Sequence, residues 1–118
     1  MLVNELAHSL AEEIKESEEY RRLLQVLEKV NQTENTRNML AEFQQKRMEL
    51  QQSQLRGEAV PEEKARQIEK MKEALAANPT MTEYQMAELS LLQMIEKVEK
   101  IIWKGVEGAL LIKPQDIA

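Results

Sequence analysis

Residues 81–111 read MTEYQMAELSLLQMIEKVEKIIWKGVEGALL. They contain no proline, and their apolar residues recur at the three- and four-residue steps of an α-helix. Plotted at about 100° per residue, these apolar positions cover more than half of the circumference. An ordinary surface helix needs an apolar stripe of about 100°. The stretch therefore predicts a long C-terminal helix that a single neighbouring helix cannot cover.

The width of this apolar surface predicts self-association. Burying a large aliphatic side chain contributes about 1.5–3 kcal/mol, so several left in water would be a serious loss for a marginally stable domain. The helices at the N-terminal end are shorter and can cover only one side. We predict a homodimer or higher oligomer built along the C-terminal helix. The interface residues expected on it are Tyr84, Leu91, Leu92, Ile95, Val98, Ile102, Trp103 and Val106.

Four further helices are expected, over residues 2–15, 18–31, 34–56 and 61–77. The third and fourth carry narrow apolar stripes and are joined by a short connection. Gly57 suits the C-cap of the third helix because glycine adopts the left-handed conformation without strain. Two narrow stripes joined in this way predict an antiparallel helical hairpin that protrudes as an arm.

Composition supports an all-α, oligomeric helical bundle with one domain over residues 1–118. Helix-forming residues dominate, and only four residues are aromatic, so a sheet is disfavoured. Because the sequence has no cysteine, it excludes disulfides and thiolate-ligated metal or iron–sulfur centres.

Charge and hydropathy limit the classes of partner that the protein can bind. The net charge of −5 and the scattered Lys and Arg residues disfavour direct binding to nucleic acid. No apolar run approaches the length of about 20 residues that spans a bilayer, and the N-terminal residues do not form a signal peptide. The sequence predicts a cytoplasmic protein without a membrane partner.

Candidate chemistry is sparse. The only histidine forms the spacing Glu5-x-x-His8, which is found in di-iron bundles, but it lies opposite the apolar face of its helix and is not repeated. A solvent-facing histidine is the favoured reading. Met71, Met81, Met86 and Met94 suggest an adaptable binding surface or, more simply, core filling. We assign no catalytic, cofactor or metal residue and predict that the protein is not an enzyme.

The order and spacing of several short stretches resemble the YlbF/YmcA family of small helical bacterial regulators, and in particular its stand-alone YheA-like members. These stretches are Leu6-Ala7, Ser17-Glu18-Glu19-Tyr20 with Leu23, Val30-Asn31, Thr36-Arg37-Asn38-Met39 with Phe43, Leu50-Gln51-Gln52, Gly57, Pro61-Glu62-Glu63, Ile101-Ile102, Lys104 and Val106-Glu107.

The resemblance implies an all-helical, self-associating fold and a regulatory role without catalysis. The best-understood members are adaptors that form a complex with one another and with ribonuclease Y. Some of those members are thought to carry iron–sulfur clusters on cysteines, which this sequence lacks. The leading hypothesis is an adaptor that binds itself and a cytoplasmic protein, with RNA-processing and developmental regulators as candidates. The alternatives are a structural or chaperone-like oligomer and a metal enzyme using Glu5 and His8.

Overall fold

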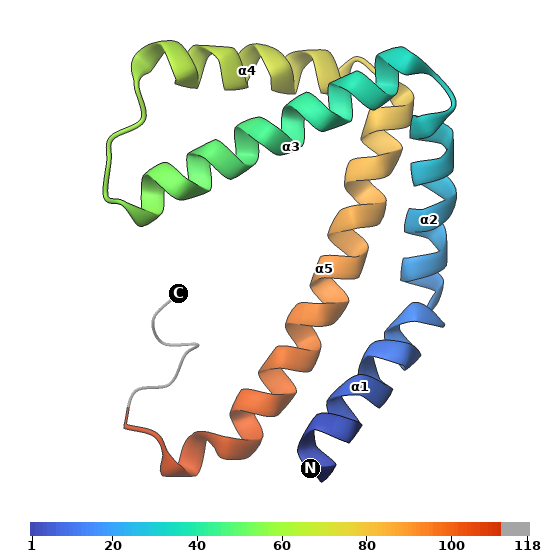
Figure 1. Cartoon of the computed structure of the whole chain (residues 1–118), viewed down its shortest axis with the longest axis vertical. Coiled ribbons are helices and arrows are strands. Elements are labelled where there is room, and N and C mark those ends of the chain that lie inside the picture. The colour runs from blue at the N-terminus through green and yellow to red at the C-terminus, as the bar shows by residue number, and fades with distance from the viewer. Residues whose placement is uncertain (112–118) are drawn as a thin grey trace.

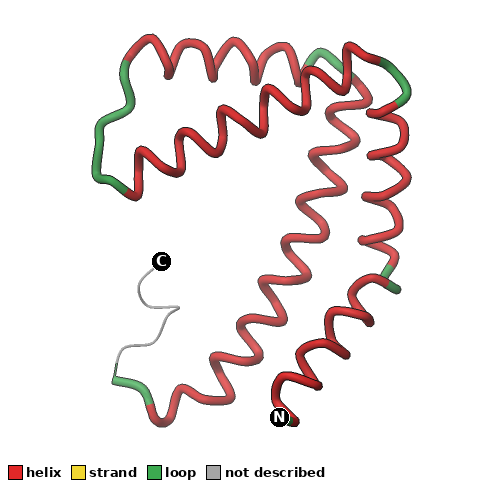
Figure 2. Tube along the Cα trace, viewed as in Figure 1, coloured by secondary structure: helices red, strands yellow, loops and turns green. Residues whose placement is uncertain are grey.

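The computed structural model describes residues 1–111, which form five α-helices and one short 3₁₀ helix. The helices are α1 (Leu2–Lys15), α2 (Glu18–Asn31), α3 (Glu34–Leu55), α4 (Glu62–Ala76) and α5 (Pro79–Val106), and the 3₁₀ helix is η1 (Glu107–Ala109). Figure 2 shows helix throughout the described chain, joined by short loops. The predicted all-α fold, with a long C-terminal helix and a protruding antiparallel hairpin, is confirmed.

The molecule has two limbs that meet at a corner (Figure 1). We call α1, α2 and α5 the leg, and α3 with α4, residues 34–76, the arm. The principal extents are 47 × 37 × 21 Å, so both limbs are thin. Helix α2 runs along α5, whereas the arm meets α5 only near the corner. The arrangement leaves the far ends of both limbs with few neighbours.

The core lies at the corner. Seven apolar side chains are buried there, and one polar side chain, Thr36, is buried with them. The apolar residues come from four helices: Val26, Val30, Leu40, Leu75, Met81, Tyr84 and Ala87. All three residues that α5 contributes lie in its first nine positions. The corner is therefore the part of the chain that fixes the angle between arm and leg.

The helix boundaries follow from capping. The hydroxyl of Ser17 accepts a hydrogen bond from the backbone N–H of Tyr20 at 3.2 Å and donates one to the carbonyl of Ile14 at 2.6 Å. This turn ends α1 and starts α2 in a new direction. Gly57 has φ 71°, as predicted for a left-handed C-terminal position. The N–H of Glu58 then donates to the carbonyl of Ser53 at 3.0 Å, which closes α3.

Helix α5 differs from the predicted range 81–111 at both ends. It begins at Pro79 because the side chain of Asn78 caps it, accepting hydrogen bonds from the N–H groups of Thr80 and Met81 at 3.0 and 3.2 Å. Proline is tolerated in the first position, where its missing N–H would have no partner. The helix ends at Val106, and η1 follows, because Gly105 and Gly108 weaken helical order there.

Candidate interaction surface

The eight residues predicted for an interface divide into three groups along α5. Tyr84 is buried in the protein's own core, so it is not available to a partner. Leu91, Ile95 and Val98 are half-buried farther along the helix. Leu92, Ile102, Trp103 and Val106 are exposed, with 51, 52, 39 and 48% of their surface in solvent. Three of the four exposed residues lie at the end of the leg, and Leu92 lies nearer the corner.

The exposed face of the leg continues the stripe that is buried at the corner. At about 100° per residue, Ile102 and Val106 point in nearly the same direction as Tyr84. Helix α2 packs along α5, but it has 14 residues against the 28 of α5. The stripe is longer than its cover. The last turns of α5 consequently present an apolar face to solvent.

Helix α1 does not extend that cover, contrary to the expectation that the first two helices would share it. Within residues 1–111, no Cα atom of α1 lies within 8 Å of a Cα atom of α5. The turn at Ser17 directs α1 away, and none of its residues is buried. Its own apolar stripe is therefore open, with Leu2, Val3 and Leu6 between 60 and 70% exposed.

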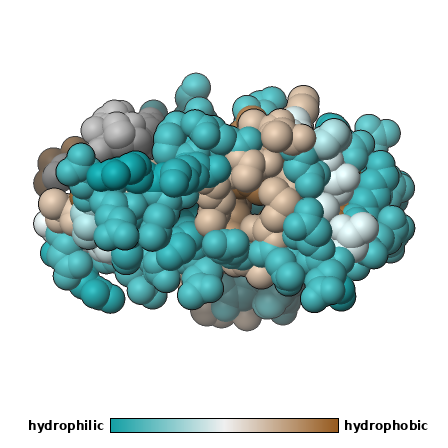
Figure 3. Space-filling model, turned by 90° about the horizontal axis from the view of Figure 1, so that it is seen from above, coloured by the Kyte–Doolittle hydropathy of each residue, from teal (hydrophilic) through white to brown (hydrophobic). Residues whose placement is uncertain are grey.

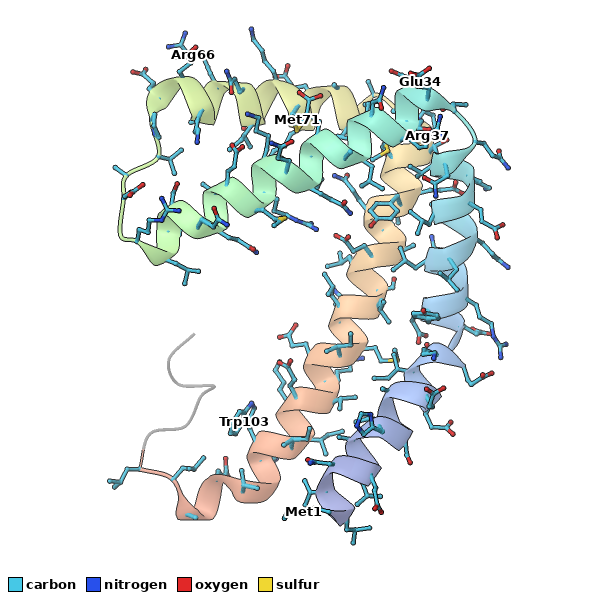
Figure 4. The ribbon with its side chains drawn as sticks, in the orientation of Figure 1. Met1, Glu34, Arg37, Arg66, Met71 and Trp103 are labelled. Atoms are coloured by element: carbon cyan, nitrogen blue, oxygen red, sulfur yellow. The ribbon has the colours of Figure 1, made fainter. Side chains whose placement is uncertain are left out.

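A second part of the surface faces the arm. Trp103 projects from α5 on the side of the arm (Figure 4). Leu92 points in nearly the same direction, about 20° from Trp103 around the helix axis. Near the corner, Leu92 lines a shallow hollow of about 470 Å³ together with Gln44, Arg47, Met48 and Gln51 of α3. The inner side of the two limbs thus carries exposed apolar side chains from both.

One polar cluster braces the corner beside this surface. The Nη1 atom of Arg47 lies 3.0 Å from Oε1 of Glu88, and the Tyr84 hydroxyl donates to Oε2 of Glu88 at 3.1 Å. Burial raises the pKa of Tyr84 above its ordinary value, and the charge of Glu88 adds to the effect. The hydrogen bond to Glu88 raises the pKa of Arg47. Each of the three side chains has a partner within the chain, and the contacts join α3 to α5. The cluster therefore braces the corner.

The side chains singled out for other chemistry lie apart. His8 is exposed on α1. Among residues 1–111, no group of three or more His, Asp or Glu side chains is placed to hold a metal ion. The four methionines also divide, since Met81 is fully buried and Met86 is 57% exposed. In the same residues, no helix combines the length and the hydrophobicity needed to cross a membrane.

Comparisons with known proteins agree with this architecture. The profile of the family described as control of competence regulator ComK, YlbF/YmcA, matches residues 3–107. The UPF0342 protein of Halothermothrix orenii is 34% identical over 107 residues, covering 91% of each chain. The UPF0342 protein of Desulfitobacterium hafniense is also 34% identical, over 116 residues that cover 98% of this chain and 94% of the relative.

Two solved structures are similar in fold. A protein of unknown function (DUF964) from Bacillus stearothermophilus superposes with a TM-score of 0.80 at 23% identity, covering 95% of this chain and all of that one. RicA of Bacillus subtilis, solved in complex with RicF, gives 0.62 at 21% identity, with 90 and 94% covered. The match over residues 3–107 and the relatives at 34% identity show that the chain belongs to the YlbF/YmcA family.

Proposed function

We propose that the protein is a non-enzymatic regulatory adaptor of the cytoplasm, which associates with itself through the leg and binds a second protein. The observation that carries the proposal is the open apolar face of the leg. Ile102 and Val106 on α5, and Leu2, Val3 and Leu6 on α1, are all about half or more exposed. Monomeric proteins rarely leave contiguous apolar surfaces of this kind in water.

The family supports the regulatory part of the proposal. Its description connects it to control of the competence regulator ComK. RicA, which shares the fold, is in complex with RicF, so this fold is compatible with a protein-binding surface. The described chain presents exposed apolar residues on its helix faces, which suit contact with another protein.

Light scattering of the purified protein tests self-association. We expect a particle at least twice the chain mass of 13.7 kDa at micromolar concentration. Ile102→Glu with Val106→Glu should shift it to the monomer, because two carboxylates would have to be buried. A wild-type protein that stays monomeric would overturn the proposal.

The matched control is Met86→Glu. Met86 is 57% exposed on the same helix, close to the 52% of Ile102. It lies about 160° around the axis from Ile102. We expect this variant to keep the wild-type mass, which separates loss of an interface from a general effect of a new charge on α5.

Affinity capture from native lysate, with wild type and the monomeric double variant, tests whether the protein binds a second protein. An adaptor recovers a small set of proteins in fixed proportion. Recovery of many unrelated proteins would instead support the chaperone-like alternative, and recovery of the bait alone would contradict an adaptor role.

A further inference from the structure

The arm contains a narrow apolar groove with a positively charged rim. Its floor consists of Phe43 and Leu50 on α3 and Ile68 and Met71 on α4, and its volume is about 180 Å³. All four floor residues are only half-buried. Met71 points from α4 toward α3 (Figure 4). Figure 3 shows, from above, a patch of apolar atoms between hydrophilic side chains near the middle of the molecule.

The rim selects an acidic occupant. The groove is lined by Lys46, Arg47 and Lys72 and by no acidic side chain. Lys46 and Arg47 have partners within the chain, whereas Lys72 forms no ion pair among residues 1–111. The arm as a whole holds eight basic and eight acidic residues, so the net charge of −5 lies outside it. The positive rim is a local feature of the groove.

The size of the groove suits side chains from a helix. Its volume is below the range of about 300–1,000 Å³ that is usual for small-molecule sites. Phe43 and Leu50 are two helical turns apart, which is about 10 Å. Leucines four residues apart on another helix are spaced about 6 Å, so two of them fit along this length as knobs between α3 and α4.

Helix α1 has the complementary surface. Leu2, Leu6 and Leu10 are four residues apart, all are exposed, and they lie on one face. Glu5 lies about 60° to one side of that face, and Glu13 lies in line with the leucines, about one turn beyond Leu10. Neither carboxylate forms an ion pair among the described residues. Helix α1 lies at the end of the leg that is away from the arm, and it contacts only α2, at the junction of the two helices (Figure 1). It therefore cannot reach its own arm.

We propose that α1 of a second copy of this chain docks into the groove between α3 and α4, with its leucines on the floor and Glu5 beside the basic rim. The inference rests on the proposed self-association and assigns it a contact. In a two-fold pair each copy gives one α1 and receives one, so the contact occurs twice. The contact covers the exposed leucines of α1 with the half-buried floor of the groove.

Cysteine cross-linking of the full chain tests the contact, because the wild-type sequence has no cysteine. Leu6→Cys with Lys72→Cys places thiols on α1 and on the rim. The matched control is Leu6→Cys with Arg66→Cys, since Arg66 is on α4 and points away from α3 (Figure 4). With a short bismaleimide, we expect dimers to form several-fold faster in the first variant. Equal rates, or a cross-link within one chain only, would overturn the inference.

Charge exchange gives a second readout. Lys46→Glu with Lys72→Glu, and separately Glu5→Lys with Glu13→Lys, should each raise the dissociation constant of the dimer by about two- to fivefold, as exposed pairs do. Combining all four changes should restore it. Loss without restoration would overturn the charge pairing.

The outcomes separate the two proposals. A wild-type monomer in light scattering removes self-association and this contact together. A wild-type dimer that shows no preference for Lys72→Cys over Arg66→Cys leaves self-association in place and removes only the docking of α1. The groove would then be open to an acidic helix of a different protein.

Discussion

Arg47 of α3 and Glu88 of α5 are 41 positions apart in the chain, and their side chains meet at 3.0 Å. Arg47 also stacks over the ring of Phe43, with its guanidinium carbon 5.3 Å from the ring centroid. The Glu88 side chain is only 19% exposed, so solvent screens this pair less than a pair on an open surface. The pair joins arm to leg beside the apolar core at the corner.

Glu88→Gln should lower the free energy of unfolding by about 1–2 kcal/mol, because it removes the charge from a partly buried hydrogen-bonded pair. Urea denaturation measures the change. Glu83→Gln is the control, since Glu83 pairs with Lys29 at 3.3 Å with both side chains about half exposed. We expect the control to cost less than about 0.5 kcal/mol. Equal losses would contradict a bracing role for Glu88.

Tyr84 predicts a loss of stability at alkaline pH. Its pKa is raised in the folded state, first by burial and then by Glu88. The folded chain therefore holds the phenolic proton more tightly than the unfolded chain. The stabilisation is fully present below the ordinary value of 10.0 and is lost as the pH rises through the folded pKa. Unfolding curves measured across this window should show the decline, and Tyr84→Phe should reduce its slope.

Leu75 anchors the arm in the core. It is 1% exposed, so Leu75→Ala should cost about 2–5 kcal/mol from lost burial and the cavity left behind. Leu55 provides a control on the same arm, because it is 87% exposed. Leu55→Ala should change the free energy of unfolding by less than about 0.5 kcal/mol. Thermal or urea unfolding measures both, and similar values would contradict the placement of the core at the corner.

Thr36 joins α2 to α3 through its side chain. Its hydroxyl is buried and donates to the carbonyl of Val30, near the end of α2. Thr36→Val keeps the shape but leaves that carbonyl without this donor, which should cost about 1–3 kcal/mol. The exposed Thr82, whose hydroxyl donates to the carbonyl of Asn78 at 3.2 Å, is the control. Thr82→Val should cost clearly less in the same unfolding measurement.

Trp103 reports on self-association directly. It is the only tryptophan in the sequence and is 39% exposed in the single chain. If the leg is covered by a second copy, its fluorescence emission should shift to shorter wavelength as concentration rises and return on dilution. Ile102→Glu with Val106→Glu should remove the dependence. An emission maximum independent of concentration in an associating wild type would exclude Trp103 from the interface.

Most helix boundaries of this protein follow from local sequence patterns. The caps at Ser17, Thr33 and Gly57 and the acidic first turns can be read from neighbouring residues, because a cap needs only groups within a few positions. Helix α5 begins at Pro79, two residues before the predicted start at residue 81. Asn78 caps it there, because its side chain satisfies two N–H groups and Pro79 needs none.

The candidate surface divides in the same way. Periodicity identified the broad apolar face of α5, including Ile102 and Val106, because every residue of a helix has a direction set by its number. Periodicity could not show that Tyr84 is buried in the core or that α1 does not cover α5. Those facts depend on the direction in which the chain leaves Ser17 and on the angle between arm and leg, which the core at the corner and the Arg47–Glu88 pair set together. Such angles arise from contacts between residues distant in the chain, which no local pattern records.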